Sequence, residues 1–340
     1  MMTKTKALAM LSGGLDSILA TKLIINQGIE VEAINFQGFF CSCKGSGSSA
    51  SEAAKHLGVP LKIVTVGSSY LAMLRSPKHG YGKNMNPCVD CKIFMLKEGK
   101  KYARQIKAAF VFTGEVLNER PMSQHFQALK TIEEESGLKG RLLRPLSAKL
   151  LPETIIEKQG LVERNQLLNL SGRSRKPQIE LAKKLGVSRF PSPAGGCLLT
   201  EAEFSIRLRD LLDHKKHCSV GDVALLRVGR HFRFGENKII VGRDENENKT
   251  LLKEKQKHDL LFEAAEIAGP ITVLQGQKTK KAVELAAAMT AFYSDAETNT
   301  VRINYGRESL NRSLTAQVPG RAEMENLRIG RRILSQKLLP

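Results

Sequence analysis

Residues 7–17 read Ala-Leu-Ala-Met-Leu-Ser-Gly-Gly-Leu-Asp-Ser, an apolar run followed by a glycine-rich turn. The apolar residues after the turn recur at the spacing of one helix face: Leu15, Ile18, Leu19 and Leu23. Two adjacent glycines let the backbone approach an anion closely, and a helix start offers unpaired N–H groups. The stretch therefore predicts a strand, a turn and a helix that together hold phosphate groups.

The side chains of the turn fit this interpretation. Ser12 and Ser17 supply hydroxyl donors, and Asp16 can hold Mg²⁺ or cap the helix. The turn lacks both the Gly-Lys-Ser/Thr ending of a Walker A loop and the Gly-x-Gly-x-x-Gly pattern of a dinucleotide fold. We therefore expect a phosphate-binding turn of a different kind.

Composition limits the partners of this chain. Its 340 residues suffice for two domains, and its net charge of +19 favours a polyanion, most simply nucleic acid, although charge alone also fits a merely basic protein. No apolar run approaches the roughly 18 residues of a membrane span. No cleavage site follows Met1–Lys6, so we expect a cytoplasmic protein without a membrane partner.

The first part of the chain alternates strands with helices. The expected strands span 7–11, 31–36, 61–66 and 108–113. This alternation predicts an α/β fold with a doubly wound parallel sheet. Ligands of such sheets lie at the carboxyl ends of the strands, where we expect Gly13, the Cys41 loop and Thr113–Glu115 to converge.

The pattern changes beyond His214, where shorter strands are expected at 223–228, 238–241, 271–274 and 301–304, with a helix at 281–293. These elements predict a second, smaller α+β domain. We assign 1–200 to a catalytic domain, 201–220 to a linker helix, 221–306 to the second domain and 307–340 to a basic tail.

Cysteines form a second distinctive pattern. Cys88 and Cys91 make a C-x-x-C, and Cys197 follows two glycines far downstream. Three cysteines can hold zinc with an open position, hold a [4Fe-4S] cluster with one open iron, form a redox trio, or simply be buried. Cys41 and Cys43 follow the second expected strand and are either spare sulfur carriers, alternative ligands or small loop residues.

Residues 12–17 resemble the Ser-Gly-Gly-x-Asp-Ser signature of the PP-loop ATP pyrophosphatases. Together with the Asn-Pro-Cys-x-x-Cys-Lys segment at 86–92 and Gly-Gly-Cys at 195–197, they resemble tRNA-specific 2-thiouridylases and the catalytic part of tRNA 4-thiouridine synthetases. The chain opens directly on the loop, so the N-terminal THUMP region of the latter is not expected here.

The resemblance implies an adenine nucleotide alpha hydrolase-like fold and ATP-dependent tRNA uridine thiolation. In this reaction a uridine carbonyl oxygen is adenylated and sulfur is then inserted through a three-cysteine [4Fe-4S] cluster. Sulfide or a persulfide carrier would donate the sulfur. Three alternatives stay open: a cysteine-persulfide thiolase without a cluster, another PP-loop tRNA-modifying ligase, and a non-catalytic RNA-binding protein.

The resemblance also implies roles for particular residues. The expected catalytic residues are Asp16, Cys88, Cys91 and Cys197, the three cysteines being the metal ligands as well. The cofactors would be ATP, Mg²⁺ and the cluster. The expected ATP contacts are Ser12, Gly13, Gly14, Leu15, Asp16, Ser17, Phe36, Thr113, Gly114, Glu115 and Arg120.

Short blocks between 234 and 294 resemble the NFACT-R type of RNA-binding domain, which implies tRNA as a partner. The basic residues expected to contact RNA lie in both domains: Arg173, Arg175, Lys176, Arg230, Arg233 and Arg243. A homodimer is left open.

Overall fold

The computed structural model describes residues 5–38, 40, 46–190 and 196–330. The chain divides into two compact units, Met1–Leu198 and Leu199–Pro340. Within the described residues, no helix is both long and apolar enough to cross a membrane. The expected residues Cys41 and Cys43 lie outside the described part of the chain.

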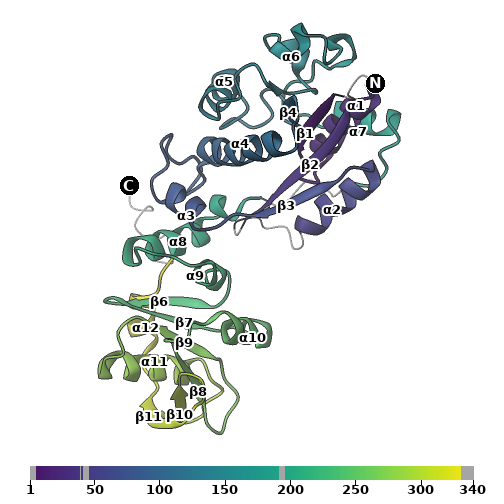
Figure 1. Ribbon diagram of the computed structural model, residues 1–340. Helices are drawn as coiled ribbons and strands as arrows, with labels where there is room; N and C mark the ends of the chain where they lie inside the picture. Colours follow the sequence, from purple (N-terminus) through teal and green to yellow (C-terminus); the bar gives the residue numbers. More distant parts are fainter. Residues whose placement is uncertain (1–4, 39, 41–45, 191–195, 331–340) are drawn as a thin grey trace. The chain divides into compact units, whose positions relative to one another are not determined.

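The first unit is built on a parallel sheet of five strands in the order β3-β2-β1-β4-β5 (Figure 1). The strands are β1 (Lys6–Met10), β2 (Glu30–Gln37), β3 (Leu61–Thr65), β4 (Phe110–Thr113) and the short β5 (Leu142–Leu143). The predicted α/β fold with a doubly wound parallel sheet is confirmed.

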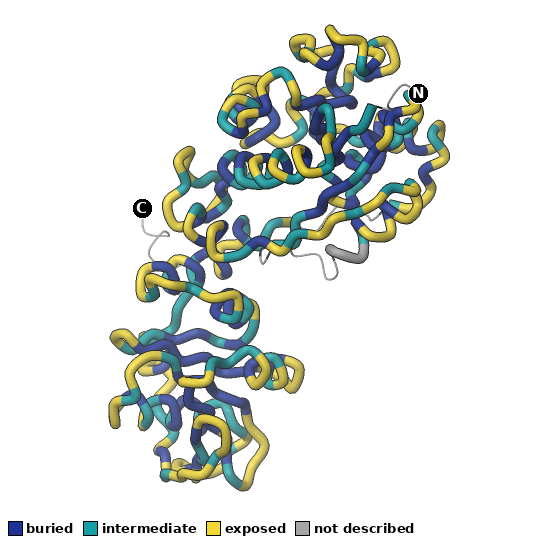
Figure 2. The backbone as a smooth tube through the Cα atoms, in the orientation of Figure 1, coloured by how far each residue is buried: buried dark blue, intermediate teal, exposed yellow. Residues whose placement is uncertain are grey.

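Helices cover both faces of this sheet. The helices of this unit are α1 (Leu15–Asn26), α2 (Ser46–Leu57), α3 (Ser68–Arg75), α4 (Cys88–Gln105), α5 (Phe126–Glu135), α6 (Ile155–Lys158) and α7 (Lys176–Lys184), with 3₁₀ turns at Ala148–Leu150, Arg164–Gln166 and Leu198–Thr200. One core holds residues of α1, α2 and α7, and the core on the opposite face holds residues of α4 and α5. The four apolar residues predicted for the buried face of α1 are all buried. Figure 2 shows how buried, intermediate and exposed residues are distributed along the chain.

The order of the strands fixes where a ligand can bind. The chain runs outward from β1 through β2 to β3, and then returns to place β4 on the other side of β1. In an open α/β sheet, ligands bind at such a reversal, beyond the carboxyl ends of the two central strands. The glycine-rich turn at 12–14 follows the end of β1, and Gly114 and Glu115 follow the end of β4.

The second unit contains an antiparallel sheet in the order β11-β10-β8-β9-β7-β6. Its strands are β6 (Arg230–Phe234), β7 (Asn237–Val241), β8 (Leu260–Ala264), β9 (Thr272–Gln275), β10 (Thr300–Gly306) and β11 (Arg312–Gln317). Its helices are α8 (Ala202–His214), α9 (Val220–Leu225), α10 (Glu245–Glu254), α11 (Lys280–Phe292) and α12 (Arg321–Leu327). The predicted second α+β domain is thus confirmed, and the stretch expected as a basic tail carries β11 and α12.

One strand prediction is wrong. Residues 223–228 were expected to be extended, but 223–225 form the end of helix α9, Val220–Leu225, and 226–228 lie in the turn that follows it. A capping box starts this helix: Ser219 Oγ accepts from the Asp222 N–H at 3.2 Å, and Asp222 Oδ2 accepts from the Ser219 N–H at 2.8 Å. The apolar run Val223–Leu226 fits a strand and a buried helix equally well, and the cap decides between them.

Candidate active site

The turn after β1 has the backbone that two glycines allow. Gly13 has φ +83°, and a Cβ on it would lie 2.6 Å from the Ala50 backbone nitrogen, so only glycine fits there. Ser17 Oγ accepts from Ser12 Oγ at 3.1 Å and donates to the Gly14 carbonyl at 2.8 Å. Gly14 is the N-cap of α1 and supplies no side-chain cap, which leaves the N–H groups of the first turn available to an anion.

The segment after β4 packs against this turn. A Cβ on Gly114 would lie 2.5 Å from the carbonyl carbon of Asp16 and 2.5 Å from the amide nitrogen of Ser17. The close approach requires glycine, and it brings Thr113–Glu115 to the start of α1. Two expected groups of nucleotide contacts, far apart in sequence, are therefore neighbours in the structure.

Asp16 lies in the first turn of α1 among arginines. The Arg175 Nη2 atom is 3.7 Å from Asp16 Oδ2. Burial raises the pKa of Asp16, and the charges of Arg175 and Arg120 oppose that rise. Within the described residues, Asp16 Oδ1 and Arg175 Nε are buried without a hydrogen-bond partner. Such unused hydrogen-bonding groups beside a glycine-rich turn suit a charged ligand.

Glu119 is a further carboxylate in this region that the sequence did not single out. Burial and the nearby charge of Asp16 raise the pKa of Glu119, while Arg120, Arg175 and Lys92 lower it. The carboxylates of Asp16 and Glu119 thus share one electrostatic environment with two arginines.

Glu115 connects the β4 end to helix α4. The Lys92 ammonium donates to Glu115 Oε1, and Arg144 Nε donates to Oε2 at 3.0 Å. Burial would raise the pKa of Glu115, but the charges of Lys92 and Arg144 lower it to about 2. The contacts of Glu115 are those of a structural anchor; Thr113 Oγ1 also donates to its Oε2 atom, at 3.1 Å.

Two of the three predicted cysteines lie on the first turn of α4. Pro87 is the N-cap of this helix, and both Cys88 and Cys91 receive a hydrogen bond on sulfur. Asn86 Nδ2 donates to Cys88 Sγ at 3.1 Å, and the buried Tyr70 hydroxyl donates to Cys91 Sγ at 3.1 Å. Hydrogen bonds to sulfur are one means by which proteins tune thiolates and iron–sulfur groups.

Cys197 meets this pair from a distant segment. Burial raises the pKa of Cys91 to about 12, and the charges of Cys197 and Cys88 raise it further, against the Tyr70 hydrogen bond and the Lys92 charge. The same three sulfurs, after burial, raise the pKa of Tyr70. The Leu198 N–H donates to the Phe40 carbonyl at 2.8 Å, and the Phe40 ring lies 5.9 Å from the ring of Tyr70, so the segment of Cys197 reaches the region of Tyr70 and Cys91. In the described part of the chain, no three His, Cys, Asp or Glu side chains are arranged to hold a metal ion.

The remaining predicted residues have diverse surroundings. Phe36 lies half-buried in β2, and Arg173 and Lys176 are exposed beside Arg175. In the second unit, Arg233 is paired with Asp210 through two hydrogen bonds of 2.9 and 2.5 Å. Arg243 is paired with Glu247, and Arg230 lies over the ring of Tyr293.

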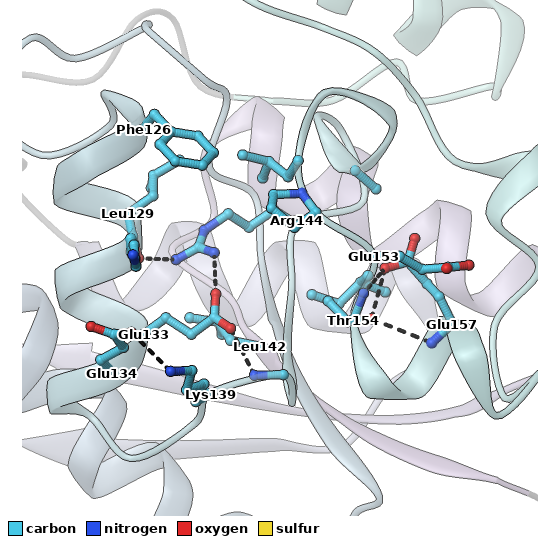
Figure 3. A pocket seen from close by; sticks show the side chains of 16 residues that line it. Phe126, Leu129, Glu133, Glu134, Lys139, Leu142, Arg144, Glu153, Thr154 and Glu157 are labelled. Atoms are coloured by element: carbon cyan, nitrogen blue, oxygen red, sulfur yellow. Dashed lines mark hydrogen bonds and ion pairs between the residues drawn. The ribbon is translucent and has the colours of Figure 1, made fainter.

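A pocket of about 320 Å³ lies beside α5 and is shown in Figure 3. None of the predicted site residues lines it. Glu133 points between Arg144 and the backbone of Gly140, accepting from Arg144 Nη1 at 2.9 Å and from the Gly140 N–H at 2.7 Å (Figure 3). Arg144 also binds Glu115. The pocket therefore lies beside the ion pair that holds Glu115, and not beside the glycine-rich turn or the cysteines.

Tyr70, Lys92 and Arg144 were missed as site residues. Lys92 could have been found, since it directly follows the C-x-x-C. Tyr70 and Arg144 carry no local signal, because only tertiary packing brings them to Cys91 and Glu115.

Two family models match this chain. Residues 2–158 match the family model described as thiamine biosynthesis protein (ThiI), and residues 229–327 match the NFACT protein RNA binding domain. The chain resembles the PP-loop enzymes that thiolate tRNA. The predicted resemblance of both parts of the chain is confirmed.

Individual relatives match to different extents. The tRNA-specific 2-thiouridylase of Pelobacter propionicus is 33% identical over 91 residues, which are 25% of this chain and 26% of that protein. The chain thus spans about a quarter of that relative. The tRNA-specific 2-thiouridylase of Pseudomonas fluorescens is 20% identical over 349 aligned residues, covering 94% of this chain and 91% of that protein.

Solved structures show weaker likeness. A 4-thiouridine synthetase in complex with RNA and ATP is 22% identical, with a TM-score of 0.35, and 54% of this chain and 52% of that one are covered. The U34-tRNA thiolase NcsA of Methanococcus maripaludis, solved with its [4Fe-4S] cluster, is 18% identical, with a TM-score of 0.33 and coverage of 66% and 70%.

Proposed function

We propose that this protein is an ATP-dependent tRNA uridine thiolase. One observation carries the proposal: a continuous series of contacts joins the glycine-rich turn to the cysteines. Gly114 packs on Asp16, Glu115 binds Lys92, and Lys92 is adjacent to Cys91. An ATP-binding turn and a sulfur centre are the two parts that thiolation of a carbonyl group needs.

The first half-reaction uses the turn and its arginines. The uridine carbonyl oxygen attacks the α-phosphorus of ATP, the bond to the β-phosphate oxygen breaks, and pyrophosphate leaves. The N–H groups at the start of α1 and the hydroxyl of Ser12 would hold the departing pyrophosphate. Arg120 and Arg175 would neutralise its charge, and Asp16 would hold a Mg²⁺ ion that supplies further charge stabilisation.

The second half-reaction replaces oxygen by sulfur. A sulfur nucleophile attacks the activated carbon, and AMP leaves with the former carbonyl oxygen. Cys88, Cys91 and Cys197 have the number and kind of side chain that bind a [4Fe-4S] cluster with one open iron, and they would have to move closer together to do so. Cys88, Cys91 and Cys197 would hold it, and that iron would supply a site for sulfide.

We assign tRNA docking to the second unit together with the net charge of +19. A basic chain gains affinity for RNA from phosphate contacts, and these contacts carry little base specificity. The match of residues 229–327 to an RNA-binding domain supports this assignment.

The test compares the wild type with Cys197→Ala after anaerobic purification. We expect about four irons and four acid-labile sulfides per wild-type chain, and their loss in the variant. ATP–pyrophosphate exchange should persist in the variant, while tRNA thiolation should disappear. Cys218→Ala, which changes a cysteine of the second unit, is the control and should retain iron and thiolation.

Two results would contradict parts of the proposal. Thiolation by Cys197→Ala would exclude the three-cysteine centre. Iron-free wild-type protein that still thiolates tRNA would favour a cysteine persulfide, whereas ATP–pyrophosphate exchange without any thiolation would favour another PP-loop ligase.

A further inference from the structure

The second unit contains a polar pocket of about 380 Å³ that the proposed thiolation does not use. It lies at the start of β6, the start of α10 and the end of α11. Its wall combines charged, amide and aromatic side chains, among them Arg230, Arg243, Asn248, Tyr293 and Asp295.

Arg230 is the central donor of this pocket. Its guanidinium carbon lies 4.4 Å from the centre of the Tyr293 ring, and Nη1 donates to the Gly242 carbonyl at 2.9 Å. Across the residues that the structure describes, Arg230 makes no ion pair with a carboxylate. Burial lowers the pKa of Arg230, and the neighbouring charges of Arg328 and Arg243 lower it further against the opposing effect of Tyr293. An acceptor-bearing ligand would relieve this repulsion.

Arg243 and Asn248 are held in place by contacts of their own. Arg243 Nε donates to both carboxylate oxygens of Glu247, at 2.9 and 3.0 Å. Asn248 Oδ1 accepts from the Ile271 N–H at 3.0 Å, which leaves its amide nitrogen as a donor. The donors of the pocket are therefore positioned before any ligand binds.

The pocket also contains acceptors. Asp295 is exposed, and its backbone N–H donates to the Ala268 carbonyl at 2.9 Å, while no ion pair of its carboxylate occurs among the described residues. Asp244 caps α10 by accepting from the Glu247 N–H at 3.0 Å, and Glu245 pairs with Lys249 at 2.6 Å. These carboxylates would repel a bare phosphate, so the pocket is not a simple phosphate site.

We propose that this pocket receives one unpaired RNA nucleotide, with guanine preferred, stacked on the Arg230–Tyr293 pair and read by Asp295. Guanine presents two adjacent donors, N1–H and N2–H₂, which a single carboxylate accepts together, and two acceptors, O6 and N7, which suit the arginine and amide donors. Single-stranded RNA is commonly recognised by stacking on aromatic rings or guanidinium planes. The inference rests on the proposed RNA-docking role of this unit and adds the base and its contacts.

The test uses the full chain and two labelled heptanucleotides, UUUGUUU and UUUAUUU, with binding measured by fluorescence anisotropy. We expect the wild type to bind the guanine oligonucleotide about tenfold more tightly. Arg230→Gln retains a donor for the Gly242 carbonyl and should weaken that binding about tenfold. Asp295→Asn should abolish the preference for guanine.

Arg302→Gln is the matched control. Arg302 is an exposed arginine of the same sheet, on β10, and three strands separate β10 from β6, which places it roughly 19 Å away. It should bind both oligonucleotides within twofold of the wild type. Equal losses of affinity in Arg230→Gln and Arg302→Gln would overturn the proposed guanine site. Equal affinity of the wild type for the two oligonucleotides would also overturn it. Thermal unfolding of each variant verifies that it is folded.

The pocket and the proposed function fail separately. If the heptanucleotides behave as expected but tRNA is not thiolated, the catalytic proposal fails and the pocket stands. If tRNA is thiolated while guanine is not preferred, the proposed guanine site is wrong and the proposed thiolase function is retained.

Discussion

The glycine-rich turn and the cysteine centre of the first unit are assembled in opposite ways. In the turn, Ser12, Gly14 and Ser17 contact one another within six residues of sequence, and the backbone itself forms the site. Around Cys91, the partners Tyr70 and Cys197 arrive from separate segments. A site formed by backbone groups can be predicted from a short motif. A site formed by side chains from distant segments depends on how those segments pack together.

The buried Glu115 joins the two regions. Substitution of its partner Arg144 should therefore have the largest effect on stability. Arg144→Met would leave the buried Glu115 and the partly exposed Glu133 without their guanidinium, and should lower the free energy of unfolding by about 3–5 kcal/mol. Urea unfolding measures this change. Arg141→Met alters an exposed arginine three residues away and should cost less than about 0.5 kcal/mol. Equal losses would contradict the role of Glu115 as an anchor.

The same carboxylate predicts a pH dependence. The folded-state pKa of Glu115 is about 2, below the ordinary value of 4.5, so its stabilising contribution is complete above pH 4.5 and is lost as the pH falls toward 2. Urea unfolding of the wild type between pH 6 and pH 2.5 should show this loss. A Glu115→Gln variant, which does not titrate, should show a shallower decline, and identical slopes would contradict the shifted pKa.

A glycine substitution tests the turn. Gly114→Ala would place a methyl group 2.5 Å from the backbone of Asp16 and Ser17, so the turn must move. We expect a loss of about 1–3 kcal/mol in stability and a clear loss of ATP binding by calorimetry. Gly67→Ala is the control, because no atom lies within 4 Å of a Cβ at that position and its φ is −114°. Normal ATP binding by Gly114→Ala would show that the close approach is dispensable.

Substitutions of Arg175 and Arg173 test the proposed nucleotide contacts against the proposed RNA contacts. Arg175 lies beside Asp16, so Arg175→Ala should weaken ATP binding about tenfold with little effect on stability. Arg173→Ala removes an exposed charge and should leave ATP binding unchanged while weakening tRNA binding slightly. The reverse pattern, measured by calorimetry and filter binding, would return Arg175 to the RNA contacts.

The smallest effect is expected from a substitution beside Cys91. Tyr70→Phe removes the hydroxyl that donates to Cys91 Sγ and should cost about 1 kcal/mol of stability. The same substitution at Tyr305, in the second unit, should change stability by less than about 0.5 kcal/mol. Urea unfolding of both variants distinguishes them, and equal effects would show that the Tyr70 hydroxyl contributes nothing specific.

Much of the architecture could be predicted from the sequence because its signals are local. The apolar run 7–11, the two glycines and the spacing of the apolar residues after them predicted a strand, a turn and a helix. The structure has β1 and α1 at these positions. Strand 223–228 failed because an apolar run of that length fits a strand or a helix, and the Ser219–Asp222 cap selected the helix. Strands β6 and β8 were missed, although each contains an aromatic residue and buried positions.

Some features of the candidate site are also local in sequence, and others depend on tertiary packing. The sequence by itself determined the glycine-rich turn and the Cys88–Cys91 pair, because glycine conformations and the C-x-x-C spacing are properties of adjacent residues. Only the tertiary structure decided that Arg175 lies at Asp16, that Arg233 is paired with Asp210, and that Glu115 is an anchor. A charged side chain contacts whatever partner folding brings within a few ångströms, and that partner is set by the packing of whole elements rather than by neighbouring residues.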